Sequence, residues 1–162
     1  MSKQIKLTQG KFAIVDESDF AVLSKHKWLA SRGCNAWYAN RTTRGGGTQG
    51  TESMHRRILG AQSNQQVDHV NGNGLDNRRV NLRLCTNRQN AQNRRGVRGK
   101  CSFKGVRPDG NRWRSRIRSG DGVETHLGMF STAEGAARAY DRAAVEQFGA
   151  FAATNVKLGL LA

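Results

Sequence analysis

A basic, glycine-containing stretch at residues 94–100 is the feature that most limits how this chain can fold, because it lacks the apolar periodicity found on either side. The whole chain has 162 residues, so each flanking part can bury only a modest hydrophobic core. We therefore predict two small folded parts joined by a basic linker at residues 96–102.

The part before this stretch has the pattern of a small mixed α/β lobe followed by a β-β-α unit. The predicted elements of the lobe are strands at Ile5–Leu7, Phe12–Val15 and Ala36–Asn40 and one or two helical turns within Asp16–Leu23. The unit at 67–94 consists of a strand from Val67, a polar, turn-rich loop, a second strand at Leu82–Cys85 and a helix from Asn87 to about Arg94. We place the lobe at 1–53 and the β-β-α unit at 54–95.

The part after the stretch predicts three antiparallel strands and one helix, so the expected fold class is α+β. The strands are Phe103–Arg107, Arg112–Arg118 and Glu124–Phe130, and they are joined by the turn signals Pro108-Asp109-Gly110-Asn111 and Gly120-Asp121-Gly122. Ser131 and Glu134 form a capping box that opens an alanine-rich helix, which Gly149 closes after Phe148. We place this module at 103–155.

The middle strand of this module has one basic and one apolar face. Its arginines recur at every second position and therefore share one face, while Trp113 and Ile117 point toward the helix. These arginines are Arg112, Arg114, Arg116 and Arg118. Carboxylates on neighbouring strands are too few to neutralise them all, so we expect phosphates and guanine edges to supply the missing partners. A merely solvated charged strand is the alternative.

The charge balance favours a polyanionic partner. Lysine and arginine number 27 against 12 aspartate and glutamate residues, a formal net charge of +15, and a surface this basic repels itself unless a polyanion screens it. Nucleic acid is the first candidate. A membrane surface is the competing polyanion, but the sequence has no run of about 18 apolar residues and no apolar signal region after Met1. We therefore expect a cytosolic protein.

The cysteines do not indicate a disulfide framework or a zinc site. Cys34, Cys85 and Cys101 are odd in number, widely spaced and never arranged as C-x-x-C. We expect free thiols.

Candidate catalytic residues lie in the β-β-α unit. Hydrolysis of a phosphodiester needs a base to activate water and a cation to neutralise the transition state. Adjacent residues on a strand point to opposite faces, so His69 can be the base while Asp68 reaches a cation by another route. Asn90, 22 positions after Asp68 and inside the predicted helix, offers a neutral oxygen ligand. Oxygen ligands favour Mg²⁺ or Mn²⁺ over zinc, so one such ion is the expected cofactor.

This arrangement resembles the HNH endonucleases, particularly those of phages and mobile introns. The matching segments are Val67-Asp68-His69-Val70-Asn71-Gly72, Leu75-Asp76-Asn77-Arg78, Asn81-Leu82-Arg83 and Gln89-Asn90. In that family the first His is the general base, the preceding Asp and the last His or Asn bind one divalent metal, and the middle Asn braces the loop. By position the resemblance implies these roles for His69, Asp68, Asn90 and Asn81. Met54-His55-Arg56 resembles an M-H-R segment of such proteins, in which His55 either orients the scissile phosphate or is structural.

The C-terminal module resembles the AP2 DNA-binding domain over about 103–155. The matching segments are Lys104-Gly105-Val106-Arg107, Trp113, Ile117-Arg118, Leu127-Gly128-Met129-Phe130, Thr132-Ala133-Glu134, 136–144, Gly149 and Asn155. AP2 domains lay a three-stranded sheet in the major groove. By position the resemblance implies DNA contacts for Lys104, Arg107, Arg112, Arg114, Arg116, Arg118 and His126. Glu124 and His126 depart from the common Arg and Trp of plant members, so base preference does not transfer.

The sequence as a whole therefore predicts a metal-dependent HNH endonuclease that its AP2-like module targets to double-stranded DNA. The resemblance implies selfish-element mobility, a cytoplasmic location in a bacterial or phage-infected cell, and no small-molecule cofactor beyond the metal. The oligomeric state stays open. One alternative is a non-catalytic AP2-like DNA-binding regulator with a degenerate nuclease lobe. The presence of Asp68, His69 and Asn90 argues against it, because a pure DNA-binding protein would not need them. The other is an RNA-binding protein, which the scarcity of aromatic residues among the arginines disfavours.

Overall fold

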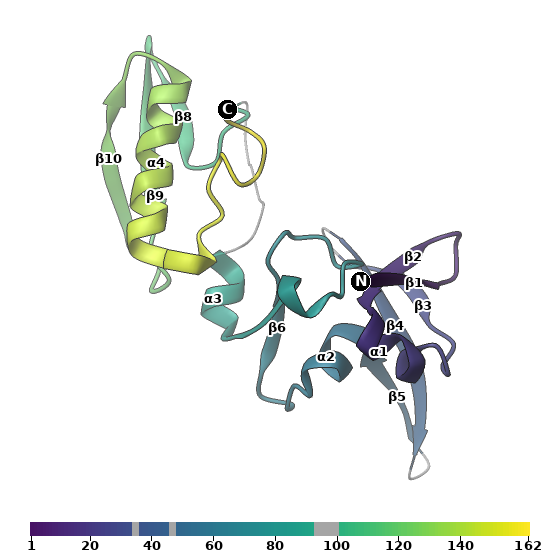
Figure 1. The fold of residues 1–162 in the computed structure, drawn as a ribbon. Helices are drawn as coiled ribbons and strands as arrows, with labels where there is room; N and C mark the ends of the chain where they lie inside the picture. The colour runs from purple at the N-terminus through teal and green to yellow at the C-terminus, as the bar shows by residue number, and fades with distance from the viewer. Residues whose placement is uncertain (34–35, 46–47, 93–100) are drawn as a thin grey trace. The chain divides into compact units, whose positions relative to one another are not determined.

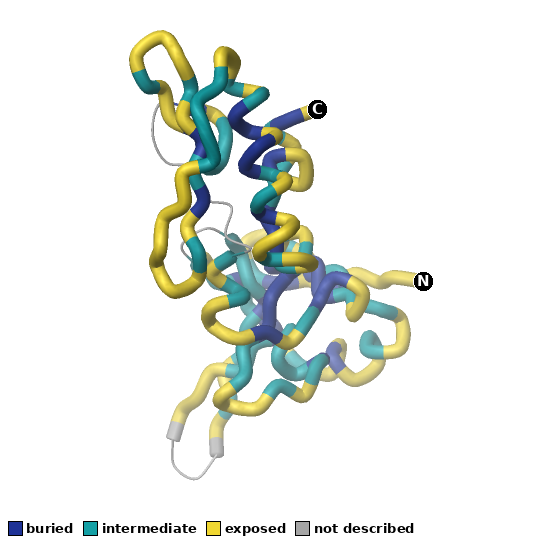
Figure 2. The backbone as a smooth tube through the Cα atoms, turned by 90° about the vertical axis from the view of Figure 1, so that its left-hand side faces the viewer, coloured by how far each residue is buried: buried dark blue, intermediate teal, exposed yellow. Residues whose placement is uncertain are grey.

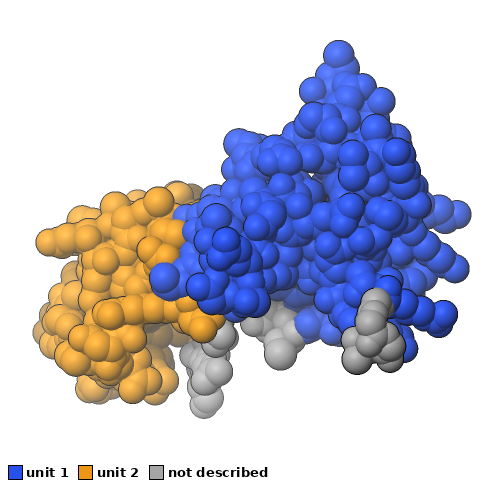
Figure 3. Space-filling view, turned by 90° about the horizontal axis from the view of Figure 1, so that it is seen from below, with its two compact units in different colours: residues 1–86 blue, residues 87–162 orange. Residues whose placement is uncertain are grey.

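The computed structural model describes residues 1–33, 36–45, 48–92 and 101–162. The chain divides into two compact units, Met1–Thr86 and Asn87–Ala162, which Figure 3 colours separately. Each unit has buried residues of its own, drawn dark blue in Figure 2. Residues 96–100 of the predicted linker lie outside the described residues.

Unit 1 is built from small antiparallel sheets and short helices (Figure 1). Its elements are β1 (Ser2–Lys6), β2 (Phe12–Asp16), α1 (Glu17–Leu23), β3 (Leu29–Arg32), β4 (Trp37–Gly45), β5 (Thr48–Ser53), α2 (Met54–Leu59), β6 (Gln66–His69), the 3-10 helix η1 (Arg79–Asn81) and β7 (Leu82–Cys85). β1 pairs with β2, β4 lies between β3 and β5, and β6 pairs with β7.

One hydrophobic cluster connects the whole of unit 1. It includes Trp28 from the segment before β3, Met54 from α2, and Val67 and Leu82 from the β6–β7 pair. The indole Nε1 of Trp28 donates a hydrogen bond to the carbonyl oxygen of Leu23 at 2.8 Å, so its one polar group is satisfied inside the core. Residues 1–53 therefore share a core with 54–86. The bounds of the four predicted segments stay a prediction.

The structure confirms several predicted elements of unit 1 and adds others. A strand at Phe12–Asp16 and a helix at Glu17–Leu23 agree with the sequence, and β6 and β7 flank a polar loop as expected. β5 was not predicted, because Thr-Gln-Gly-Thr-Glu-Ser contains no apolar residue and so carries no alternation. Pairing with β4 makes it a strand.

Unit 2 contains a three-stranded antiparallel sheet with one long helix (Figure 1). Its elements are α3 (Asn87–Gln92), β8 (Val106–Asp109), β9 (Arg112–Arg118), β10 (Glu124–Phe130), α4 (Ala133–Phe148) and the 3-10 helix η2 (Gly149–Phe151). β9 is the central strand, between β10 and β8. In the described part of the chain no helix is long and apolar enough to cross a membrane.

Two boundaries in unit 2 differ from the sequence prediction. The first strand runs from Val106 to Asp109, not from Phe103 to Arg107, because Asp109 pairs with Arg112 and leaves only Gly110-Asn111 as the turn. Pro108 is tolerated there because β8 is an edge strand, where a missing donor is harmless. The cap of α4 is Thr132, whose hydroxyl accepts a hydrogen bond from the Gly135 N–H, not Ser131.

The predicted faces of β9 are confirmed. Ile117 is buried against Tyr140 and Ala144 of α4, and Trp113 packs partly buried on a second cluster that includes Ala136 and Ala137. The arginines alternate with these residues and lie on the side away from the helix, mostly exposed. Alanines on α4 leave room for the sheet to approach the helix closely.

The two faces of β9 contribute unequally to stability. We expect Ile117→Ala to lower the free energy of unfolding by about 2–5 kcal/mol, because it removes buried methylene groups and leaves a cavity. Arg118→Ala, on the adjacent exposed position, should change it by less than about 0.5 kcal/mol. Urea denaturation of both variants measures the difference. Equal losses for the two variants would contradict the face assignment.

Candidate functional site

The loop between β6 and β7 is held closed by the side chain of Asn81. Its Oδ1 accepts a hydrogen bond from the backbone N–H of Asn71 at 2.9 Å, and its Nδ2 donates to the carbonyl oxygen of Asp76 at 2.7 Å. Asn81 is buried, so these bonds satisfy both ends of its amide. One residue on η1 thus connects the start and the end of the loop.

Neighbouring strands fix the same loop from outside. The N–H of Ile14 on β2 donates to the carbonyl oxygen of Leu75 at 2.8 Å, and the N–H of Asn77 donates back to the carbonyl oxygen of Ile14 at 2.7 Å. Gly74 lies so close to β4 that a Cβ there would be 2.4 Å from the carbonyl oxygen of Trp37. The loop therefore has a single position against the core.

The carboxylate of Asp76 is bonded to other residues of the same loop. Its carboxylate accepts hydrogen bonds from Arg78 Nε at 2.7 Å and Nη2 at 2.6 Å, and from the Asn71 amide at 2.9 Å. The hydrogen bonds from Arg78 hold the pKa of Asp76 below its usual value, although partial burial opposes the shift. The loop thus contributes a fixed negative charge near the end of β6.

His69 ends β6 with its ring buried beside this loop. Its exposed fraction is 6%, and Nε2 lies 3.4 Å from Oδ1 of the fully buried Asn77. In this arrangement Nε2 carries the proton, and the neutral ring keeps its lone pair on Nδ1. Burial lowers the pKa of His69, opposed by the Asn77 hydrogen bond and by the charges of Asp68 and Asp76. The imidazole is therefore neutral, and able to accept a proton, at neutral pH.

A second histidine and a tyrosine pack against His69. The ring of His55, on α2, lies 5.1 Å from the His69 ring, and Tyr38 of β4 lies 5.9 Å from both. Burial, and to a smaller degree the neighbouring His69 and Arg56, lower the pKa of His55 to about 3. Its buried Nδ1 has no hydrogen-bond partner among the described residues. The structure thus brings His55 and His69 together in one cluster.

Asp68 points to a different partner. Its Oδ2 accepts hydrogen bonds from Nε and Nη2 of Arg83 on β7, at 2.8 and 2.6 Å. Both residues are largely buried and pair directly across the β6–β7 ladder. Arg83 therefore compensates the buried carboxylate in this structure.

The predicted metal pair is divided between the two units. Asp68 belongs to unit 1, whereas Asn90 lies on α3, which groups with unit 2. Among the described residues no group of three or more His, Cys, Asp or Glu side chains forms a metal cluster. A site that uses Asp68 and Asn90 thus stays a prediction.

In unit 2, three of the predicted DNA contacts line one hollow of about 480 Å³. Arg114, Arg116 and His126 share it with Asp109, Glu124 and Met129. Arg107, Arg112 and Arg118 are exposed elsewhere on this sheet. Lys104 differs, since its ammonium donates to the carbonyl oxygen of Gln92 at 3.3 Å and burial lowers its pKa to about 8. Lys104 is thus directed partly toward the interior of its own unit.

Comparison with known proteins agrees with the geometry of the β6–β7 region. A family profile described as HNH endonuclease matches residues 61–92. An uncharacterized HNH endonuclease of Acanthamoeba polyphaga mimivirus is 32% identical over 155 residues, which cover 91% of this chain and 76% of that protein. The chain belongs to the HNH endonuclease family. It is accordingly a nuclease, and nucleases of this family generally use a divalent metal ion.

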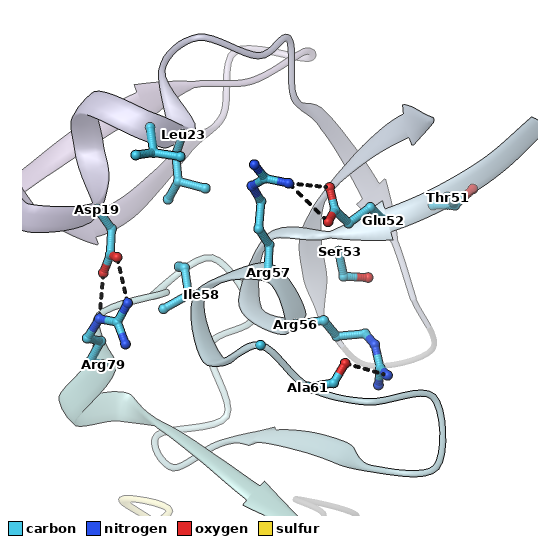
Figure 4. Close-up of a pocket in the computed structure, with 12 residues that line it drawn as sticks. Asp19, Leu23, Thr51, Glu52, Ser53, Arg56, Arg57, Ile58, Ala61 and Arg79 are labelled. Carbon is cyan, nitrogen blue, oxygen red and sulfur yellow. Dashed lines mark hydrogen bonds and ion pairs between the residues drawn. The ribbon is translucent and has the colours of Figure 1, made fainter. Parts of the chain in front are cut away.

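A hollow of about 560 Å³ in unit 1 of this nuclease has no histidine among its lining residues (Figure 4). It is bordered by α1, β5, α2 and η1, and it contains two ion pairs. Arg79 donates to Asp19 at 2.7 and 2.8 Å, and Arg57 donates to Glu52 at 3.3 Å. The Arg79–Asp19 pair links α1 to η1 and so supports Asn81 two residues further on.

Three residues around the nuclease's histidines were not singled out from the sequence. Asn77 and Arg83 lie within the matching segments, but nothing in their spacing shows that they contact His69 and Asp68. Tyr38 is 31 positions before His69, and no local pattern connects the two. Only the folding of β4 against the loop makes it a neighbour.

Burial of His55 makes the nuclease sensitive to acid. The unfolded chain protonates this residue near pH 6.5, whereas the folded chain does so near pH 3, so stability falls as the pH decreases through this window. The expected slope from this residue is up to about 1.4 kcal/mol per pH unit.

We expect His55→Phe, which keeps an aromatic ring, to flatten the dependence of unfolding free energy on pH between these values. His126→Phe makes the same substitution at an exposed position and is the matched control, against which the effect of His55→Phe is measured. Urea denaturation at a series of pH values measures both. An unchanged slope in His55→Phe would show that folding does not lower the pKa of His55.

Proposed function

We propose that this nuclease hydrolyses phosphodiester bonds of double-stranded DNA with His69 as the general base, one divalent ion held by Asp68 and Asn90, and unit 2 as the DNA-binding module. The observation that carries the proposal is His69, a buried neutral imidazole whose Nε2 faces Asn77 in a loop braced by Asn81. A base of this kind needs no deprotonation at neutral pH before it acts on water.

The residues of unit 1 support this chemistry in separate ways. Asn77 holds the ring of His69 so that Nδ1 presents the lone pair, and that nitrogen takes the proton of the attacking water. Tyr38 and His55 pack against the ring and restrict its rotation. Asp68 and Asp76 supply nearby negative charge that stabilises the imidazolium formed in the step. Asn81 acts through the loop and is a positioning residue.

The donor set fits a hard divalent cation. Asp68 offers carboxylate oxygens and Asn90 an amide oxygen, the ligand types that Mg²⁺ and Mn²⁺ prefer. Such an ion would supply positive charge to the phosphate undergoing attack. Arg83 is the cation that pairs with Asp68 in this structure, and it can share the carboxylate or turn toward a phosphate when the ion binds.

The sheet of unit 2 supports the proposed role in targeting. Its outer face carries arginines at alternate positions of β9, together with Arg107 and His126, and its three-stranded form agrees with the AP2 resemblance. Arginine pairs bidentately with guanine in the major groove, into which a sheet can be inserted. The resemblance to phage- and intron-type members extends the proposal to a homing endonuclease.

His69→Ala is the direct test of the base. We expect it to reduce cleavage of supercoiled plasmid by about 10²–10⁴-fold and to leave the affinity for duplex DNA nearly unchanged, because His69 is buried in unit 1. His26→Ala removes a histidine outside the cluster and should cut as the wild type does. Cleavage by His69→Ala within about tenfold of the wild type would exclude His69 as the base.

The metal assignment predicts a second pattern. A chelator should abolish cutting by the wild type, and Asp68→Asn or Asn90→Ala should cut weakly with partial rescue at high Mg²⁺ or with Mn²⁺, since each change weakens one of few oxygen ligands. Calorimetric titration with Mn²⁺ provides a readout independent of activity. Asn87→Ala, on the same helix, should bind Mn²⁺ as the wild type does. Cleavage that survives the chelator would refute the assignment.

A further inference from the structure

The arginines on the outer face of β9 already have partners within unit 2. Nε and Nη2 of Arg114 both donate to Asp109 Oδ2, and Nη1 of Arg116 donates to Glu124 Oε1 at 2.5 Å. Arg112 and Arg118 instead donate to the carbonyl oxygens of Met129 and Gly122, each at 2.9 Å. Carboxylates of neighbouring strands therefore neutralise two of the four arginines, and the other two donate to neutral carbonyl oxygens.

The two carboxylates come from opposite sides of the central strand. Asp109 ends the edge strand β8 and Glu124 begins the other edge strand, β10, so each neighbour of β9 provides one acid to one arginine. Both pairs border the same hollow, together with His126 and Met129. Two adjacent guanidinium groups are thus neutralised at the centre of the proposed DNA surface.

These ion pairs are too exposed to contribute much stability. The side chains of Arg114 and Asp109 are 49% and 40% exposed, and those of Arg116 and Glu124 are 27% and 47% exposed. Exposed pairs of this kind contribute about 0.2–1 kcal/mol. A competing acceptor can therefore displace the carboxylates, and their main effect concerns what the arginines bind.

A phosphate and a guanine edge differ in how they meet these carboxylates. A phosphate offers the guanidinium the same anionic acceptors as a carboxylate, so it must displace Asp109 or Glu124 and leave that acid facing the DNA backbone. The guanine edge has two neutral acceptors, and a carboxylate can accept from an adjacent cytosine amine. The two acids therefore penalise backbone contacts more than base contacts.

We propose that Asp109 and Glu124 are specificity-determining residues. By pairing with Arg114 and Arg116 they weaken the binding of these arginines to phosphates and so restrict them to contacts with bases. The inference rests on the proposed DNA-binding function of unit 2. It predicts that these acids lower affinity for DNA of arbitrary sequence and thereby increase discrimination.

The test measures duplex binding by full-length Asp109→Asn and Glu124→Gln in the presence of chelator, so that binding is separated from cutting. The probes are a duplex of random sequence and a duplex selected by the wild type from a random pool. Asp121→Asn is the matched control, since Asp121 is an exposed acid of the β9–β10 turn that bonds Ser119 and pairs with no arginine of β9 among the described contacts. Thermal unfolding of each variant verifies its fold.

Each of the two variants should bind the random duplex about two- to five-fold more tightly than the wild type, with a smaller change on the selected duplex. The slope of log affinity against log salt should steepen by up to about 0.9 for the arginine released. A gain no larger than that of Asp121→Asn, an unchanged ratio between the two duplexes, or a wild type that selects no sequence would overturn the inference while leaving DNA binding established. If the wild type binds no duplex, or Arg107→Ala binds as tightly as the wild type, the proposed function itself fails.

Discussion

The bridge that Asn81 makes between Asn71 and Asp76 is the interaction on which the candidate catalytic site depends. The β6–β7 loop is rich in glycine and asparagine, and Leu75 is the side chain that packs it against the core. The rest of its position depends on hydrogen bonds from Asn81 and from Ile14 of β2. Each such bond contributes only about 1 kcal/mol net, but a buried backbone group left without one costs about 1–3 kcal/mol. Loss of the Asn81 amide would remove this partner from the buried carbonyl of Asp76 and from the partly buried N–H of Asn71.

Burial of the two histidines has consequences for both chemistry and stability. Removing the rings from water lowers the pKa of His69 and of His55, so both are neutral when the chain is folded near pH 7. The neutral state suits a base that accepts a proton, and neutral imidazoles need fewer partners than charged ones. Packing two of them at 5.1 Å would be unfavourable if both were protonated. The same burial thus suits the role proposed for His69 and makes the fold sensitive to acid.

The sequence predicts the elements that carry strong local patterns and misses contacts between segments far apart in the chain. Alternation along 112–118 gives the faces of β9, and spacing around Asp68 and His69 gives the strand, loop and strand of the site. The contacts of His69 with Tyr38 and Asn77, and of Asp68 with Arg83, could not be predicted. They depend on how β4, β7 and the loop pack in the folded chain. The grouping of Asn90 with unit 2 could not be predicted either, because the spacing of the HNH motif does not show where a compact unit ends.

The charge of this protein acts on two length scales. The formal net charge of +15 is felt by a polyanion at a distance of about a Debye length, roughly 8 Å at physiological salt, and accelerates encounter with any nucleic acid. At contact distance the field is different, because Arg114 and Arg116 face carboxylates of their own unit. The long-range attraction is therefore not selective. On contact, by contrast, each of these arginines must exchange its carboxylate partner for an acceptor on the nucleic acid. If unit 2 binds DNA as proposed, selectivity arises in that exchange, because Asp109 and Glu124 repel an acceptor without negative charge least.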